Sequence, residues 1–347
     1  MPCTTLGVVP PATRDGQAYL SWNLDIMRPI KIFLNRCKFF VTPNNPYSYV
    51  SFGLPNLGGF GLMNETGLSA VGCAVGVMDG NPYGKIIWSL WADALKNYSN
   101  VEDVASHLEK TARMAVPGAN LSIFMNLNTM WMDSGGNAAV IEYSGSHIAV
   151  KYIEETGFLV ETNHHQFLDR KKSGSGDPSK QKALTGSYAR LGRAWELARK
   201  WNGQFDLEKV KKFASDHEKN YDLLKEFGIG PDKIIDDTTI CGHYWNHTRY
   251  MQQNKIFQAL EEVAEGETLM GFIMEPIKKR IHWCPEKPCR TPYKTYDAAK
   301  AFKKAEEYKK KHKLPKKTDI FESKFFNKYI TKFLYWTFSS LDKLIPI

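Results

Sequence analysis

The residue with the clearest chemical potential is a cysteine at the third position of the chain. If Met1 and Pro2 are removed, the thiol of Cys3 and a free α-amine belong to one residue. An α-amine has a pKa of about 8 in short peptides, so it can serve as the general base for that thiol. A cysteine near a chain end can also be incidental, because termini are often disordered. The residues that follow must decide between these interpretations.

The next residues predict a β-hairpin that returns polar side chains to the cysteine. A short strand from Cys3 is followed by the turn signal TRDG at residues 13–16 and by a returning strand over residues 17–26. Asn23 and Asp25 lie near the end of that returning strand. A carboxylate from Asp25, with Asn23 beside it, can hold and orient the α-amine.

Four further motifs stand out along the chain. They are GLMNETGLSAVG at residues 61–72, ETNHHQ at 161–166, GSYARLGRAWEL at 186–197 and TTICGHYW at 238–245. Together with the opening hairpin, this set resembles the cysteine N-terminal-nucleophile (Ntn) hydrolases that include the acyl-coenzyme A:6-aminopenicillanic-acid acyltransferases. The bile-salt (choloylglycine) hydrolases are more distant members of the same group. The matches span about residues 3–275.

The resemblance implies roles for individual residues. Cys3 matches the family's nucleophile, and Asp25 matches its amine-binding aspartate. Asn163 matches the asparagine whose side chain donates to the oxyanion. A backbone N–H near Cys73 or Ala74 is expected to complete the oxyanion hole, where one donor lowers the barrier by about 3–4 kcal/mol.

Substrate binding is assigned to Arg190, Trp22 and Asn64. Arg190 matches a family arginine at a helix start, and Arg193 lies on the same helical face. Recognition of a substrate carboxylate and a solvated, ion-paired face are equal alternatives for Arg190. The bile-salt branch has an arginine where this chain has Ser21 and Trp22, which argues against bile salts and favours the acyltransferase-like branch.

The implied reaction is cleavage or transfer of an acyl group from a linear or cyclic amide through a thioester on Cys3. Met1 is expected to be removed first, and Pro2 is then expected to leave when Cys3 attacks its own upstream peptide bond. The expected substrate is a small N-acyl amide. We expect no metal and no organic cofactor, although acyl-coenzyme A fits as a co-substrate if the reaction is a transfer.

Two rival hypotheses stay open. One is a catalytically silent protein that keeps the fold and binds a partner or a membrane, which retention of Pro2 would favour. The other is a conventional Cys–His hydrolase that uses Cys241 or Cys73 with help from His243 or His247.

Other titratable residues have simpler interpretations. His164 and His165 are adjacent, so a strand would point their side chains to opposite faces, which disfavours a shared metal. Glu142 lies on an alternating strand and is interpreted as a cross-strand partner or a core-edge carboxylate.

A zinc site is weighed and set aside. Cys284 and Cys289 form the segment WCPEKPC, and Cys241 with His243 could supply two more ligands. A turn with two reduced thiols is favoured for Cys284 and Cys289.

The order of the expected elements is strands, helices, strands, helices, strands, without regular β–α–β alternation. That order favours antiparallel sheets covered by helices, and the resemblance implies an α+β, four-layer αββα sandwich. Helices are predicted over residues 85–98 and 99–114, the second capped by Ser99, and again over residues 184–218 in two pieces. Residues 238–245 are strand-like.

The composition suggests where the chain divides. Residues 1–290 are expected to form the Ntn-hydrolase domain, and residues 291–347 a Lys- and aromatic-rich helical C-terminal extension. This extension carries 14 Lys and 6 acidic residues, which accounts for +8 of the net charge of +9. The body is therefore near neutral, and no nucleic-acid partner is expected.

Location and assembly follow from the same composition. No apolar run reaches the roughly 18 residues of a transmembrane helix, and no signal peptide is recognised, so a cytoplasmic protein is expected. The aromatic and Lys-rich residues 324–347 allow peripheral membrane contact, or packing on the body or in a homodimer. Packing is slightly favoured.

Overall fold

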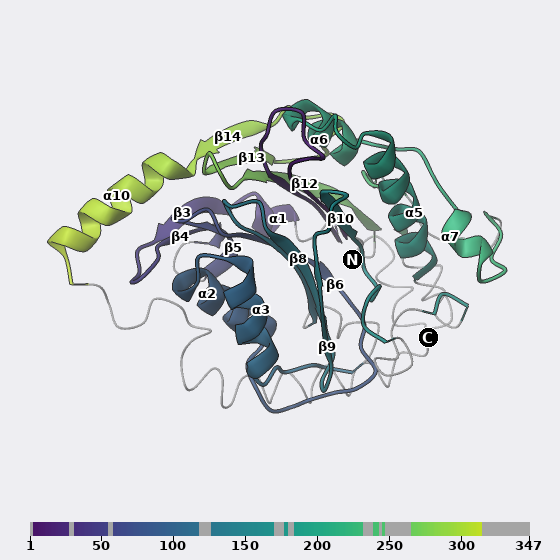
Figure 1. Ribbon diagram of the computed structural model, residues 1–347, viewed down its shortest axis with the longest axis horizontal. Helices are drawn as coiled ribbons and strands as arrows, with labels where there is room; N and C mark the ends of the chain where they lie inside the picture. Colours follow the sequence, from purple (N-terminus) through teal and green to yellow (C-terminus); the bar gives the residue numbers. More distant parts are fainter. Residues whose placement is uncertain are drawn as a thin grey trace.

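The computed structural model describes residues 3–27, 31–54, 58–117, 126–169, 177–179, 184–231, 239–242, 245–246 and 265–313. Two antiparallel sheets are stacked on each other in the centre of the molecule, and helices cover their outer faces (Figure 1). The predicted α+β, four-layer αββα class is confirmed.

The first sheet, sheet I, holds the N-terminal strand in its interior. Its strand order is β10-β1-β2-β12-β13-β14, and β11 pairs with β12. The strands are β1 (Cys3–Val8), β2 (Tyr19–Met27), β10 (Phe158–Glu161), β11 (Trp245–Asn246), β12 (Glu265–Glu275), β13 (Arg280–Cys284) and β14 (Lys294–Asp297). Because β1 has a hydrogen-bonded neighbour on each side, its first residue is fixed by the sheet.

The second sheet, sheet II, is a simple meander in chain order, β3-β4-β5-β6-β7-β8-β9. The strands are β3 (Lys38–Thr42), β4 (Tyr49–Leu54), β5 (Gly58–Asn64), β6 (Ser69–Ala74), β7 (Leu127–Met132), β8 (Ala138–Tyr143) and β9 (Ile148–Tyr152). Each strand pairs antiparallel with the next, so short turns are enough to connect most of them.

The side chains of β1 alternate between two cores, as the two-residue period of a strand requires. Cys3 lies in the apolar core between the sheets, together with Leu24 and Cys73. Leu6 and Val8 lie in a separate core between sheet I and its helices. This alternation directs the Cys3 thiol into the interior of the sandwich.

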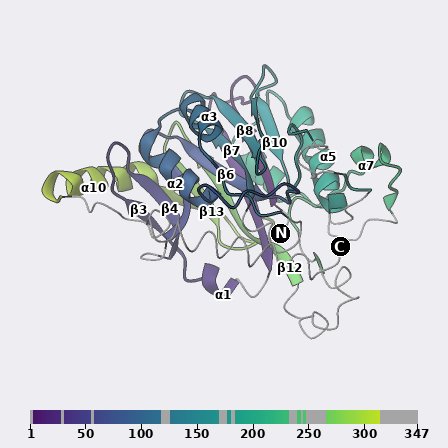
Figure 2. The same ribbon diagram turned by 90° about the horizontal axis from the view of Figure 1, so that it is seen from below.

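Helices complete the outer layers. Helices α2 (Ile87–Asn97) and α3 (Val101–Lys110) cover sheet II, as Figure 2 also shows, and α5 (Thr185–Lys200) and α6 (Leu207–Ala214) cover sheet I. The remaining described helices are α1 (Lys31–Leu34), α7 (Asp222–Lys225) and α10 (Ala298–Lys311). Among the described helices, none combines the length and apolar character needed to span a bilayer.

Two local expectations differ from the structure. Helix α3 is capped by Asn100 and not by Ser99, because the Asn100 side chain accepts a hydrogen bond from the backbone N–H of Asp103. Residues 239–242 form no strand. The backbone there bonds to Asp216, in the segment after α6, and to Thr268 of β12, which leaves no regular ladder, whereas Trp245 at the end of the predicted strand does lie in β11.

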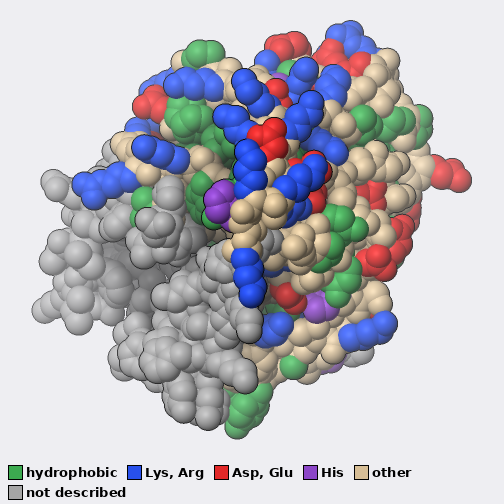
Figure 3. Space-filling model, turned by 90° about the vertical axis from the view of Figure 1, so that its left-hand side faces the viewer, with side chains coloured by type: hydrophobic (Ala, Val, Ile, Leu, Met, Phe, Trp, Pro, Cys, Tyr) green, Lys and Arg blue, Asp and Glu red, His purple; other side chains and the backbone are tan. Residues whose placement is uncertain are grey.

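The C-terminal part of the described chain is integrated with the sandwich. The sequence places a domain boundary between residues 290 and 291, whereas β14 continues sheet I beyond it and Phe302 of α10 packs in the core between the sheets. Lys309 of α10 pairs with Glu65 at 3.1 Å. Figure 3 shows Lys and Arg side chains gathered on the face where α10 lies. Residues 324–347 lie outside the described residues.

Asn64 connects the turn after β5 to the end of helix α2. Its amide nitrogen donates to the carbonyls of Leu95 and Tyr98 at 2.9 and 2.8 Å. Its Oδ1 accepts bonds from Thr66 and from the N–H of Leu68. The side chain is fully buried, and each of its polar atoms has a partner. Asn64 thus holds two layers together at the edge of sheet II.

We expect Asn64→Ala to lower the free energy of unfolding by about 2–3 kcal/mol, because it orphans buried carbonyls and N–H groups. Urea denaturation followed by circular dichroism would measure the loss. Asn97→Ala, at an exposed position in α2, is the matched control and should change stability by less than about 0.5 kcal/mol. Unchanged stability together with a raised KM would instead support the substrate-binding role predicted for Asn64.

Candidate active site

The backbone nitrogen of Cys3 lies in direct contact with Asn163. Cys3 N donates to Asn163 Oδ1 at 2.6 Å, across 160 residues of sequence. The Cys3 side chain is only 1% exposed. The nitrogen that would become the α-amine of a processed chain is therefore already placed against the predicted oxyanion residue.

The orientation of the Asn163 amide is fixed by its partners. Its Oδ1 also accepts a bond from Arg190 Nη2 at 2.8 Å, and its Nδ2 donates to the carbonyl of Ala74 at 2.8 Å. Two donors on one side and an acceptor on the other leave a single arrangement of the amide. Since the NH₂ group has two N–H bonds and the structure describes a partner for one, the second can serve an oxyanion.

Ala74 ends β6 with its backbone groups directed away from β7. The N–H of Val75 donates to the carbonyl of Asn126 at 3.2 Å, and successive residues of an antiparallel strand alternate sides. The carbonyl of Ala74 accordingly faces Asn163. The N–H of Ala74 points to the same side as its carbonyl, so it lies on the edge where an oxyanion donor is needed.

Arg190 is a buried positioning group and not a surface residue. It is 2% exposed and extends from α5 to Asn163. Its neighbour Arg193 turns instead to Asp216, with two hydrogen bonds of 2.9 and 2.8 Å. The two arginines therefore have separate partners, and Arg190 fixes Asn163 at the site.

The Cys3 thiol is electrostatically prepared for reaction. A hydrogen bond from the Cys73 side chain is the main cause that lowers the pKa of Cys3 to about 6, with burial opposing it. The backbone N–H of Asp25 and the charge of Arg190 lower this pKa further. Burial and the nearby Cys3 raise the pKa of Cys73, so its thiol stays protonated and can donate. Thiolate is the reactive form of cysteine, so this arrangement favours Cys3 as the nucleophile.

Asp25 contacts Cys3 through its backbone, while its carboxylate is held by sheet I. Its Oδ1 accepts a hydrogen bond from Thr268 Oγ1, and that hydroxyl in turn accepts one from the N–H of Gly242 at 2.8 Å. The side chain is 1% exposed. The backbone of Asp25 thus lies beside the Cys3 thiol and its carboxylate bonds to strand β12, while the predicted role of that carboxylate in holding the α-amine stays a prediction.

Asn23, Trp22 and Asn64 have partners other than Cys3. Asn23 Nδ2 donates to the carbonyls of Ala214 and Ile240, so this side chain holds the layer outside sheet I. The Trp22 ring packs in the core between the sheets, against Phe272 and Phe60. Trp22 thus lies in the same apolar core as Cys3, while Asn23 and Asn64 bond to other groups, and the site roles of all three stay predictions.

The residues beside Asn163 form its supporting frame. The His164 ring stacks on Tyr188 at 3.9 Å, and its Nδ1 contacts Ser187 Oγ at 2.8 Å. Burial lowers the pKa of His165 to about 4, so this ring is neutral near pH 7. The Glu142 carboxylate accepts three backbone N–H bonds of 2.7–2.8 Å from residues 166–168, which fixes the loop that follows Asn163.

Sequence reasoning missed Glu161, the residue at the end of β10. Its carboxyl is fully buried between the sheets and accepts no hydrogen bond within the part of the chain that the structure describes. Burial is the main cause that raises the pKa of Glu161, and the charges of Glu142 and Cys3 raise it further. The buried carboxyl of Glu161 therefore favours its protonated form. The polar motif ETNHHQ gives no sign that Glu161 is buried. Its inward direction follows only from its pairing with Thr5 of β1.

Cys241 lies behind sheet I and outside this set of contacts. The carbonyl of the preceding residue, Ile240, accepts the bond from Asn23. Burial raises the pKa of Cys241, which disfavours it as a nucleophile. His243 and His247, its predicted partners, lie outside the described residues.

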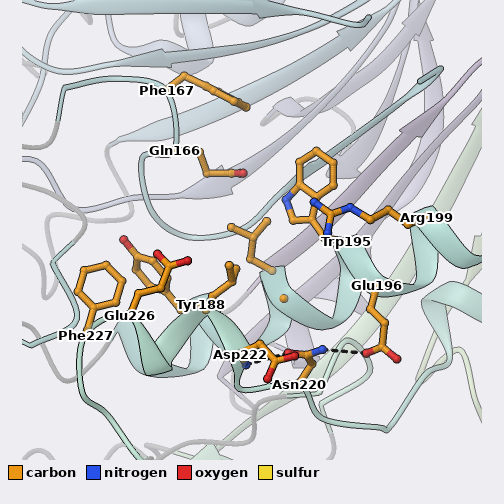
Figure 4. Close-up of a pocket in the computed structure, with 13 residues that line it drawn as sticks. Gln166, Phe167, Tyr188, Trp195, Glu196, Arg199, Asn220, Asp222, Glu226 and Phe227 are labelled. Carbon is orange, nitrogen blue, oxygen red and sulfur yellow. Dashed lines mark hydrogen bonds between the residues drawn. The ribbon is translucent and has the colours of Figure 1, made fainter. Parts of the chain in front are cut away.

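A pocket of about 530 Å³ opens on the outer side of α5 (Figure 4). Tyr188, Trp195 and Arg199 line it, and Asn220 bonds to Glu196 at 2.9 Å on one wall. Neither Cys3 nor Asn163 is among its lining residues. Tyr188 connects the pocket to the site through its stack on His164, and Gln166 and Phe167 of the loop after Asn163 also line it.

Comparison with solved structures supports the fold. The chain resembles a single-residue variant of conjugated bile acid hydrolase from Clostridium perfringens with a TM-score of 0.50 and 16% identity, covering 85% of this chain and 97% of that one. Penicillin V acylase from Agrobacterium tumefaciens matches with a TM-score of 0.45 and 14% identity, covering 86% and 87% of the two chains. The first of these likenesses confirms the Ntn-hydrolase fold.

Comparison by sequence identifies the family. No curated protein matches the chain. The family model described as acyl-coenzyme A:6-aminopenicillanic acid acyl-transferase matches residues 13–228, more than half of the chain. The enzyme class expected from the sequence, an amide hydrolase or acyltransferase, is confirmed at that level. The chain therefore belongs to the acyl-coenzyme A:6-aminopenicillanic acid acyl-transferase family.

Proposed function

We propose that this chain is an N-terminal-cysteine amidohydrolase or acyltransferase that forms a thioester on Cys3. The observation that carries the proposal is the 2.6 Å bond between Cys3 N and Asn163 Oδ1, beside a buried thiol whose pKa is lowered. A nucleophile, a proton acceptor and an oxyanion donor then share one small volume. These are the three requirements of amide cleavage by covalent catalysis.

In the first half-reaction, the Cys3 thiolate attacks the amide carbon and the carbonyl π electrons move to oxygen. The second N–H of Asn163 Nδ2 and the backbone N–H of Ala74 stabilise that oxyanion. The C–N bond then breaks, and the protonated α-amine of Cys3 gives its proton to the leaving nitrogen. A thioester on Cys3 and a free amine result.

In the second half-reaction, the neutral α-amine of Cys3 takes a proton from water or from an acceptor amine. That nucleophile adds to the thioester carbon, and the Cys3 sulfur leaves as a thiolate, which restores the thiolate and the protonated α-amine of the starting state. Water gives hydrolysis, whereas an amine gives acyl transfer. Acyl-coenzyme A would enter as an alternative acyl donor, since its thioester exchanges with the Cys3 thiol without a change in oxidation state.

Maturation uses the same atoms. After loss of Met1, the Cys3 thiol attacks the Pro2 carbonyl carbon, the Pro2–Cys3 C–N bond breaks, and water releases proline from the resulting thioester. Asn163 supports this step as well, because it already contacts Cys3 N. Pro2 lies outside the described residues, and its removal stays a prediction.

The substrate, location, cofactors and partners are also proposals. The substrate is a small N-acyl amide, the location is the cytoplasm, and no organic cofactor or nucleic acid takes part. A homodimer and peripheral membrane contact through residues 324–347 are carried by composition alone.

Cys3→Ala should abolish covalent labelling by a thiol-reactive acyl probe and should leave residue 2 attached, because one sulfur performs both reactions. Intact-mass spectrometry of labelled and unlabelled protein reports both outcomes. Cys37→Ala, at a half-buried cysteine outside the site, is the matched control and should label and mature normally. Labelling that survives Cys3→Ala would refute the assignment of the nucleophile.

Asn163→Ala should reduce kcat by about 10²–10³-fold with a small effect on KM, because one oxyanion donor acts in the transition state. Steady-state kinetics on a panel of N-acyl amino acids, N-acyl amines and penicillins would measure it. Asn137→Ala, which removes an Asn side chain bonded to Asp133 in a turn of sheet II, is the control. A rise in KM alone would contradict the oxyanion role.

Cys73→Ala should shift the reactivity of Cys3 to higher pH. In the parent protein the thiolate is populated above a pKa of about 6, so alkylation is constant through neutral pH and falls below pH 6. Without the Cys73 donor the pKa of Cys3 rises, and the same fall begins at higher pH. Iodoacetamide rates against pH give both curves, and superimposable curves would contradict the role of Cys73.

A further inference from the structure

Three potential metal ligands converge behind sheet I, from parts of the chain far apart in sequence. They are His217 after α6, Cys241 in the segment 239–242, and Cys289 in the turn after β13. Each offers one ligand atom, and these atoms all lie within 4.8 Å of one another. The histidine is exposed, Cys241 is buried and Cys289 is half-buried. Neither Cys3 nor Asn163 belongs to this cluster.

The backbones of the first two ligands are joined directly. The N–H of Cys241 donates to the carbonyl of Asp216, the residue before His217, at 3.0 Å. The Asn23 amide binds both segments from the side of β2, through the carbonyls of Ala214 and Ile240 at 2.7 and 2.9 Å. Two ligands are therefore held in place without any metal.

Ion pairs with Arg193 also hold the segment that contains His217. Arg193 bonds to the Asp216 carboxylate through two nitrogens and pairs with Glu218 at 2.6 Å. These two acidic residues flank His217 in sequence. The single charge of Arg193 cannot neutralise both carboxylates, so a net negative charge remains beside the imidazole, which favours a bound cation.

The third ligand lies on a closed turn. The N–H groups of Arg290 and Thr291 donate to the carbonyl of Lys287 at 2.9 and 3.1 Å, which folds the chain around Cys289. Cys284 at the start of the turn serves the turn itself, because its sulfur lies 3.2 Å from the carbonyls of Glu286 and Thr291. The Cys289 sulfur lies within 4.8 Å of the ligand atoms of Cys241 and His217.

We propose that His217, Cys241 and Cys289 form a zinc site with a fourth position open to solvent. Two thiolates and one imidazole are a donor set that suits Zn²⁺, and bond lengths of about 2.0–2.3 Å place such ligand atoms within the observed limit. On binding, the two thiols release two protons to the solvent, so the site becomes neutral. The exposure of His217 supplies the route for the ion.

The site is connected to the nucleophile through one short chain of contacts. Gly242 follows Cys241 and donates to Thr268 Oγ1, which donates to the Asp25 carboxylate. Asp25 in turn contacts the Cys3 thiol through its backbone. A metal that locks the segment 239–242 would therefore stabilise the outer support of Asp25. Its binding can be measured without any assay of catalysis.

Titration of the full-length, reduced, metal-free protein with Co²⁺ tests the proposal. We expect one Co²⁺ per chain with a sulfur-to-metal charge-transfer band, displaced by Zn²⁺, and a rise in Tm on addition of Zn²⁺. His217→Ala, at an exposed position that should not disturb folding, should lose the band and the rise in Tm. Cys289→Ser should also lose the band.

The controls match the variants in residue type. His312→Ala and Cys37→Ser should bind Co²⁺ as the parent does. Absence of stoichiometric binding, or binding unchanged in His217→Ala, would overturn the proposal. A thiol count of the denatured, unreduced protein that falls two short of its six cysteines, restored by reduction and absent in Cys289→Ser, would show a Cys241–Cys289 disulfide and would also overturn it.

Discussion

The hydrogen bond from Cys3 N to Asn163 Oδ1 is the contact on which the site depends. It can form only if β1 and β10 are neighbours in sheet I, because Cys3 opens one strand and Asn163 follows the other. Arg190 and the Ala74 carbonyl then fix the amide from both ends. Helix α5, both sheets and the loop held by Glu142 thus converge on one asparagine. Contacts from several layers of the sandwich therefore fix the position of the Asn163 amide.

The fold was largely predictable, because its signals are local. The hairpin around TRDG, the α2 and α3 helices and the two-piece segment of α5 and α6 all lie where their sequence patterns indicate. Errors occurred where tertiary contacts override local pattern. Asn100 caps α3 although Ser99 is equally suited by type. Residues 239–242 form no strand, because their backbone bonds to Asp216 after α6 and to Thr268 of β12. The continuation of sheet I into β14 also has no local signal, because it requires a partner strand.

The part of the candidate site that could be predicted is the part covered by the order of motifs that resembles the family. Cys3, Asp25, Asn163 and Ala74 come together, whereas Asn23, Trp22 and Asn64 have partners elsewhere. The burial of Glu161 and the donor role of Cys73 depend on which face of each strand is turned inward. That orientation depends on strand register, which the sequence alone does not give. His217 escaped for a related reason. Cys241 is the proposed metal ligand nearest to His217 in sequence. The two residues are brought together by hydrogen bonds of Asn23 and Asp216 to their segments.

Strand β2 serves two layers with alternate residues, and this limits how the chain can change length. Leu24 faces the core between the sheets, while Asn23 binds the outer segments. Insertion or deletion of one residue within the strand would exchange these faces and remove both sets of contacts at once. The tip at Asp15 and Gly16 is different, because both residues are exposed and lie outside the paired strands. Natural insertions and engineered loops between Cys3 and Asp25 are therefore expected to collect at that tip, where the spacing of the two residues in the sheet is insensitive to chain length.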